Sequence, residues 1–405
     1  MNKIKYSDKL VNLGTETAFA VSGDANEHAL KGNTVFPFHL GDINICTPQN
    51  IIEATKKAMH DEKTGYVPAN GIPQLRDTIA EVIGSQRNVN YNRENVVVQP
   101  GGKPVIPKFI NTFMNPGDGV LYPNPGYPIY ESQIEYNEGV ALPYRYIHST
   151  DGFKIDRKHL EKMIDKKTKI LIYNNYQNPI GGDSTNEEME WIANIAQKHN
   201  LWVLSDEAYF NIQYSGTPKS IVSLPGMKER TVILYTFSKT YAMTGWRLGA
   251  AIGPEKIMKI FSKLGTNDES CTNHFIQYGG IEALKGSQKG AQEILQRLKN
   301  RRDVLSSNLN ELKGLKLSIP NSTFYLFPDI TDIYKKMNAK SYEDFRKNTL
   351  LKTGVSFCTR EHFGKTIEGE DKPEDIKEKI VMGKLNKFKQ ENSLIEQPFI
   401  KDPER

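Results

Sequence analysis

The chain has 405 residues, 25% of them charged and 10% aromatic, a balance typical of a globular protein of about two domains. The formal net charge is only +5, and the lysines are scattered among acidic residues, so no basic surface for nucleic acid is indicated. No stretch approaches the roughly 20 apolar residues of a membrane-spanning helix, and the first residues do not resemble a secretory signal. The three cysteines, Cys46, Cys271 and Cys358, fit neither a disulfide framework nor a zinc site. We therefore expect a cytoplasmic protein with reduced cysteines, no metal, and no nucleic-acid or membrane partner.

Short β-rich runs alternate with helical segments along the first 240 residues. Apolar spacing predicts a strand and turn near 35–42 and helices over 50–62 and about 71–83. Five β-rich runs follow, near residues 96–100, 119–123, 169–175, 201–209 and 231–238. This alternation is typical of βαβ units that build a mainly parallel sheet covered by helices. Asn175, Asp206 and Ser238 come at the ends of such runs, and open α/β sheets bind ligands beyond the carboxyl ends of their strands.

The remaining third of the chain predicts a smaller unit. Residues 288–313 have the spacing of a long amphipathic helix, and 373–388 predict a further helix with apolar residues on one face. Between them, strands are expected over 316–320, 322–330 and 354–359.

Lys239 is the most informative residue, because it stands in the run TFSKTYAMTGWRLG (236–249). A lysine amine can bond to an aldehyde cofactor. The hydroxyls of Thr236 and Ser238, together with the Arg247 guanidinium, suit the phosphate of such a cofactor. The run resembles the lysine motif of the class I/II aminotransferases, which use pyridoxal 5'-phosphate (PLP). Thr236 stands where that family has Gly or Ser, but it keeps a hydroxyl.

Two turns after strands extend the resemblance. Gly102 and Lys103 lie in a Gly-Gly-Lys-Pro turn that opens a helix, where free N–H groups and the helix dipole favour an anion. An ordinary strand-to-helix turn is the alternative, but the aminotransferases have a similar turn at the cofactor phosphate. Tyr127, in the run PNPGYPIY, matches the aromatic ring that stacks on the pyridine in the family. We interpret Tyr130 as a core residue.

The resemblance assigns further cofactor contacts. Asn178 lies in NNYQNPIG, which is similar to the family's Asn-Pro-Thr-Gly loop, and would hydrogen-bond the cofactor's phenolic oxygen. Asp206 would pair with the protonated pyridine nitrogen and make the ring a strong electron sink; a structural salt bridge is the alternative. Tyr209 would also bind the phenolic oxygen, whereas strand alternation directs Glu207 elsewhere. By the same resemblance, Tyr66 reaches the phosphate of a partner subunit, which implies a homodimer with shared sites; a surface-loop tyrosine is the alternative. Gly41 and Asn178 contact the substrate in this resemblance.

One expected residue is missing from this pattern. Family members usually place an arginine after a Phe-Gly pair, in a strand before the last helix, to bind the substrate's α-carboxylate. The stretch from Phe363 to Pro373 contains no arginine, although the segment before it resembles the family. Arg360 or Lys365 could supply the charge, the substrate could differ, or the protein could bind PLP with little transamination. For Arg360, a solvated surface arginine is the alternative.

The resemblance implies an α/β fold, the fold type I of aspartate-aminotransferase-like PLP enzymes. It has a large domain with a mainly parallel sheet between helices and a smaller α+β domain from both termini. We assign 1–45 to a segment joining the small domain, 46–287 to the large domain, 288–390 to the small domain and 391–405 to a flexible tail. The expected function is amino-group transfer between an α-amino acid and a 2-oxo acid by a ping-pong mechanism. Alternatives are β-elimination, decarboxylation or oxidation at the same site, or a degenerate PLP-binding homologue.

Overall fold

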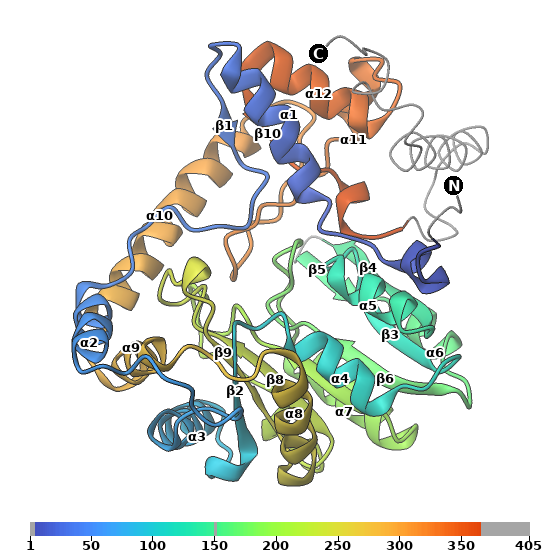
Figure 1. Ribbon diagram of the computed structural model, residues 1–405. Helices are drawn as coiled ribbons and strands as arrows, with labels where there is room; N and C mark the ends of the chain where they lie inside the picture. Colours follow the sequence, from blue (N-terminus) through green and yellow to red (C-terminus); the bar gives the residue numbers. More distant parts are fainter. Residues whose placement is uncertain (1–4, 150–151, 366–405) are drawn as a thin grey trace. The chain divides into compact units, whose positions relative to one another are not determined.

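A computed structural model describes residues 5–149 and 152–365, and its centre is one eight-stranded sheet (Figure 1). The strand order is β2-β9-β8-β7-β6-β3-β4-β5. The strands are β2 (Val96–Gln99), β3 (Gly119–Asn124), β4 (Val140–Ser149), β5 (Gly152–Ile155), β6 (Thr168–Tyr173), β7 (Trp202–Asp206), β8 (Thr231–Thr236) and β9 (Gly249–Ile252). The four inner pairings from β4 through β8 are parallel, and β2, β5 and β9 pair antiparallel. The predicted α/β fold with a mainly parallel sheet is confirmed.

Helices cover both faces of this sheet. Alternate strand residues face opposite sides, so Leu204 and Leu234 pack with one set of helices while Val203 and Ile233 pack with the other. The first face carries α4 (Val105–Phe113), α5 (Ile129–Tyr136) and α8 (Glu255–Asp268). The opposite face carries α2 (Gln49–His60), α3 (Pro73–Gln86), α6 (Arg157–Lys162), α7 (Asn186–Lys198) and α9 (His274–Lys285).

Segments from the two ends of the described chain pair with each other. Strand β1 (Phe36–Pro37) runs parallel to β10 (Val355–Ser356), and α1 (Ala18–Leu30) contacts α12 (Tyr342–Thr353). The long helix α10 (Lys289–Asn310) matches the expected amphipathic helix, and α11 (Thr331–Lys336) is a short addition. Among the described residues, no helix is both long and apolar enough to cross a membrane.

Two strands expected in the last third are wrong. The segments 316–320 and 322–330 form only isolated bridges, Lys316 with Asp329 and Gln213 with Ser322. Pro320 and Pro328 have no N–H for a ladder hydrogen bond, so neither segment can extend its pairing. The third expected strand shortens to Val355–Ser356. The helix predicted at 373–388 and the tail at 391–405 lie outside the described residues.

Candidate active site

Lys239 follows the carboxyl end of β8, where its side chain is almost enclosed. Its Nζ donates a hydrogen bond to the carbonyl oxygen of Gly41 (2.6 Å) and lies 5.4 Å from the ring centre of Phe324. Burial lowers the pKa of Lys239 to about 8, although the negative charges of Asp42 and Glu16 oppose this shift. A lysine with such a pKa is partly neutral near physiological pH, as a nucleophile or general base requires.

Asp206 ends β7, the strand beside β8, and is buried. Its carboxylate accepts hydrogen bonds from the Tyr130 hydroxyl (2.5 Å) and the Ala208 N–H (3.1 Å). Burial raises the pKa of Asp206 to about 6, and the two hydrogen bonds limit that rise. Strands β7 and β8 are parallel neighbours, and Lys239 Nζ lies 5.8 Å from the ring centre of Tyr209, three residues after Asp206, so both groups lie within one site.

Tyr130, which we interpreted as a core residue, is therefore part of the site as well. It is fully buried from α5, and its ring meets the Tyr127 ring edge-on with centres 5.7 Å apart. The position of Tyr130 three residues after Tyr127 was visible in the sequence. Its partner Asp206 is 76 residues away, so only the folded chain shows the contact.

A second residue that sequence reasoning missed is Tyr325. Its hydroxyl lies 2.7 Å from that of Tyr209, and it occupies the space that a side chain at Gly41 would need. Burial raises the pKa of both tyrosines, so both hydroxyls stay protonated and able to donate. Tyr325 lies in the segment expected to be a strand, and no local pattern marks it as a site residue.

The predicted phosphate ligands lie close together. The Thr236 hydroxyl donates to Ser238 Oγ (2.9 Å), and both residues are buried at the end of β8. A Cβ added to Gly102 would come within 2.7 Å of Leu234 and 3.3 Å of Thr236. The Arg247 guanidinium lies against Gly101, whose φ of +97° favours glycine. The structure thus brings the Gly-Gly turn, both hydroxyls and the arginine together.

Asn178 offers a direct test of whether the site suits PLP. Its Oδ1 is buried without a hydrogen-bond partner among the described residues, while its N–H donates to Asn174 Oδ1 (3.0 Å). Asn174 in turn donates to the Asp206 carbonyl oxygen (2.9 Å), which ties the two loops together. The unpaired atom is an acceptor, and the phenolic oxygen of PLP also accepts, so Asn178 would bind that oxygen through Nδ2 and leave Oδ1 for a donor of a ligand. A buried amide oxygen without a partner is costly unless a ligand completes it. The lysine, the acid, the phosphate cradle and this amide together fit PLP.

The other predicted residues have different surroundings. Lys103 Nζ pairs with Glu16 (2.8 Å) and lies 5.8 Å from the Tyr127 ring centre. Arg360 donates to Asn124 Oδ1 (2.6 Å) and to the Gly364 carbonyl oxygen (3.1 Å). Tyr66 is 91% exposed in this single chain. A residue that contributes to the site of a partner subunit is expected to be exposed when that subunit is absent. For Lys103, Arg360 and Tyr66, contact with the cofactor or substrate stays a prediction.

These elements define a class of protein: an open α/β enzyme whose lysine and acid lie beyond the ends of neighbouring parallel strands. Residues 37–369 match the model of the family aminotransferase class I and II, and the chain belongs to this family. Its members depend on PLP, and the predicted transaminase activity is confirmed at this level. A second family model, elongation factor TS, matches residues 337–405.

Individual relatives agree with this assignment. The chain is 35% identical over 299 residues to a probable aspartate aminotransferase of Methanocaldococcus jannaschii, over 72% of this chain and 78% of the relative. The solved aspartate aminotransferase from Thermus thermophilus with maleate is 27% identical, with a TM-score of 0.82 over 89% of this chain and 92% of that one. Alanine aminotransferase from Pyrococcus furiosus is also 27% identical, with a TM-score of 0.82 over 96% and 100%.

Proposed function

We propose that Lys239 is the catalytic residue of this PLP-dependent aminotransferase and that Asp206 is the partner of the cofactor's ring nitrogen. The observation that carries the proposal is an enclosed lysine with a lowered pKa and a buried carboxylate in one site beyond the ends of β8 and β7. Amide, hydroxyl and guanidinium groups suited to the rest of PLP surround them. Asn178 and Tyr209 are proposed for the phenolic oxygen, and Thr236, Ser238, Arg247 and the Gly102-Lys103 turn for the phosphate.

The chemistry follows from the charges of these groups. PLP supplies an aldehyde carbon that bonds to amines and a ring that withdraws electrons. The Lys239 amine, with its pKa near 8, can take the proton from the substrate's Cα and return it. Asp206 stays ionised above its pKa of about 6, so it can stabilise a positive charge on the ring nitrogen throughout the same pH range. Tyr130 orients that carboxylate.

The substrate is proposed to be an α-amino acid that exchanges its amino group with a 2-oxo acid in two half-reactions. The relatives above are named for aspartate and alanine, so small amino acids are the first candidates. For the α-carboxylate we propose Arg360, because its guanidinium can bind a carboxylate through two parallel hydrogen bonds. Lys365 is a point charge that pairs with Glu131 (2.9 Å) and with Glu135. Elimination, decarboxylation and oxidation would release ammonia, carbon dioxide or peroxide instead of an amino-acid product.

We also propose a cytoplasmic homodimer with shared sites. The exposed ring of Tyr66 supports it, because a large aromatic side chain that is 91% exposed loses that exposure at an interface. The division at residues 45, 287 and 390 into a large and a small domain is proposed on the same family resemblance, and the β1–β10 pairing supports the link between the N-terminal segment and the small domain.

Lys239→Ala tests the proposal directly. The variant is expected to lose the visible absorbance of the bound cofactor and nearly all transfer of amino groups, because no other amine replaces Nζ. Absorbance after PLP loading and product formation from aspartate and alanine would be measured together. Lys259→Ala is the control, since Lys259 is an exposed lysine of α8 paired with Glu255. A Lys239→Ala protein with the usual absorbance and turnover would refute the assignment.

A further inference from the structure

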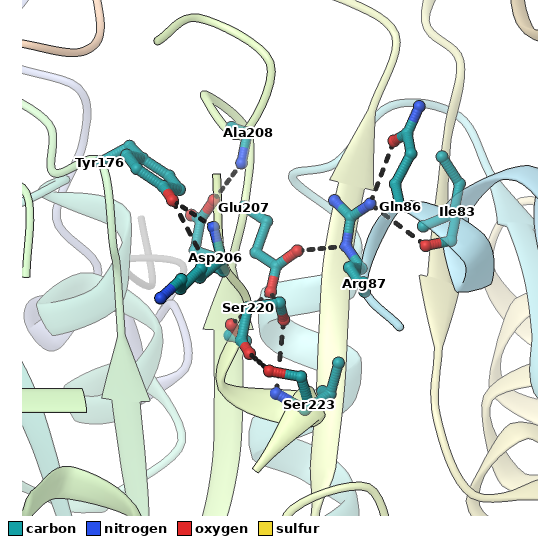
Figure 2. A network of polar contacts seen from close by, with 12 residues as sticks. Ile83, Gln86, Arg87, Tyr176, Asp206, Glu207, Ala208, Ser220 and Ser223 are labelled. Atoms are coloured by element: carbon teal, nitrogen blue, oxygen red, sulfur yellow. Dashed lines mark hydrogen bonds and ion pairs between the residues drawn. The ribbon is translucent and has the colours of Figure 1, made fainter. Parts of the chain in front are cut away.

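A buried ion pair lies directly behind the proposed active-site acid. Glu207 follows Asp206 in the chain, and its Oε2 accepts a hydrogen bond from Arg87 Nε (2.5 Å). Both side chains are almost completely buried, with exposed fractions of 0% for Arg87 and 2% for Glu207. Figure 2 shows Glu207 reaching toward Arg87 and Ser220. Neither residue touches the groups proposed to hold the cofactor, so the family assignment gives the pair no role.

The two carboxylates serve opposite faces of the sheet. Asp206 meets Tyr130 of α5, which packs on one face, whereas Arg87 follows the end of α3 on the other. The Glu207 N–H donates to the Leu234 carbonyl oxygen of β8 (3.1 Å), so the backbone at this point is held in the sheet. A contact that fixes the Glu207 side chain therefore also fixes the backbone at the end of β7, which carries Asp206.

Several donors contact the Glu207 side chain. The Ser205 hydroxyl donates to its Oε1 (2.9 Å), and the Ser220 hydroxyl donates to the same oxygen. The Arg87 guanidinium also stacks on the Phe210 ring, 3.8 Å from the ring centre, which fixes its plane. A buried charge pair with this many contacts is stable in one geometry, and the loss of either partner leaves an uncompensated charge.

We propose that Arg87 and Glu207 are positioning residues for the active-site acid. Their ion pair anchors the end of β7 behind Asp206 and offsets part of the negative charge that Glu207 places beside it. The inference rests on the role proposed for Asp206, but it concerns residues that do not contact the cofactor.

Other charged and titratable groups set the background for this effect. Asp206 faces Tyr130 from α5 and Lys239 from the loop after β8, and it also influences Tyr127, Tyr209 and Tyr325. The charge of Glu207 contributes to a higher pKa of Asp206, after burial has made the largest contribution. Tyr91 and Tyr176 lie near the Arg87–Glu207 pair and feel both charges. None of these groups is replaced in the variants below, so a difference in pH midpoint between a variant and the wild type reports on the Arg87–Glu207 pair.

The test uses the signs of the two charges. Arg87→Met leaves the negative charge of Glu207 without its partner. Glu207→Gln leaves the positive charge of Arg87 without its partner, and the glutamine oxygen can still accept hydrogen bonds from Ser205 and Ser220. The readout is the pH midpoint at which the visible absorbance of the lysine-bound cofactor changes. A negative field favours the protonated form, so Arg87→Met should raise this midpoint by roughly half a pH unit and Glu207→Gln should lower it by a similar amount. The double variant should return close to the wild-type midpoint.

Arg76→Met is the matched control. Arg76 is also a buried arginine, within α3, and is bound to the Val96 carbonyl oxygen (3.0 Å). Its replacement should affect stability without moving the midpoint. Shifts of the two single variants in the same direction, or no shift in Glu207→Gln, would overturn the inference. If Arg87→Met does not fold, the direction of the midpoint shift in Glu207→Gln alone tests the inference. A wild-type protein without any cofactor absorbance would instead refute the proposed function.

Discussion

Lys239 and Asp206 show how far a residue's role can be deduced from its neighbours in sequence. Lys239 was identified because hydroxyl residues and an arginine surround it within eleven positions, and Asp206 because a carboxylate ends a strongly apolar strand. Tyr130 and Tyr325 were missed, since their partners Asp206 and Tyr209 lie 76 and 116 residues away. The sequence contains contact-forming motifs, but it does not show which buried tyrosine meets which acid.

The Tyr130 hydroxyl gives a prediction about pH. It donates to Asp206 and so lowers the pKa of a carboxyl that burial has raised to about 6. Tyr130→Phe removes this donor, and the pKa of Asp206 should rise further. Because Asp206 works as the anion, the acidic limb of kcat/KM should move to higher pH, by about one unit. Activity profiles from acidic to mildly basic pH would show this.

Tyr144→Phe is the matched control for that experiment. Tyr144 is also fully buried, but its hydroxyl donates to the Ile172 carbonyl oxygen (3.0 Å) rather than to an acid. Its loss should lower stability and leave the acidic limb in place. An unchanged limb in Tyr130→Phe, or one displaced to lower pH, would show that Tyr130 does not control Asp206.

At the scale of elements, the sheet was predicted well and the last third poorly. The runs at 96–100, 119–123, 169–175 and 231–238 are apolar and β-branched, and all four are strands in the structure. The run at 201–209 is a strand only to Asp206, where the turn that carries Ala208 and Tyr209 begins. Three strands of the sheet were not predicted: β4 (Val140–Ser149), β5 (Gly152–Ile155) and the antiparallel strand β9 (Gly249–Ile252), whose small residues have no clear alternation. The segment 322–330 is apolar enough for a strand, but Pro328 and the contacts of Tyr325 direct it toward the site instead.

The junction of α12 and β10 depends on one glycine. Gly354 caps the helix with a φ of +75°, and a Cβ there would collide with the Thr34 carbonyl oxygen just before β1. Gly354→Ala should therefore lower the free energy of unfolding by about 2 kcal/mol or more, through both backbone strain and the clash. Urea unfolding at neutral pH would measure the loss.

Gly32→Ala separates these two causes. Gly32 also has a positive φ, +84°, but a Cβ there would meet nothing within 4 Å. Only the backbone cost applies, about 1 kcal/mol. Equal losses in the two variants would mean that the contact between Gly354 and Thr34 does not constrain the β1–β10 pairing.

At the scale of the whole molecule, the match to the aminotransferase family ends at residue 369, close to the point where the expected arginine is missing. The match to elongation factor TS continues from 337 to the last residue. The two matches overlap over residues 337–369, so both cover the segment in which the arginine is expected. Sequence reasoning found the gap because the motif stops abruptly after Phe363-Gly364, and the residues after Lys365 lie outside the described part of the chain.

The proposed homodimer can be tested by mixing two inactive proteins. A Lys239→Ala subunit keeps Tyr66, and a Tyr66→Ala subunit keeps Lys239, so each mixed dimer contains one site with both residues if Tyr66 serves the partner's site. Random reassociation makes half of the dimers mixed, so about a quarter of wild-type activity is expected if Tyr66→Ala alone is inactive. In the control, Tyr6→Ala, at another exposed tyrosine (80% exposed), is mixed with Lys239→Ala in place of Tyr66→Ala. This mixture should have the average activity of the two parent proteins, without any gain on mixing. Activity in the mixture of Lys239→Ala with Tyr66→Ala that only equals the average of the two parents, or a single chain's mass in light scattering at all concentrations, would contradict shared sites, because a residue acting within its own subunit cannot complement another.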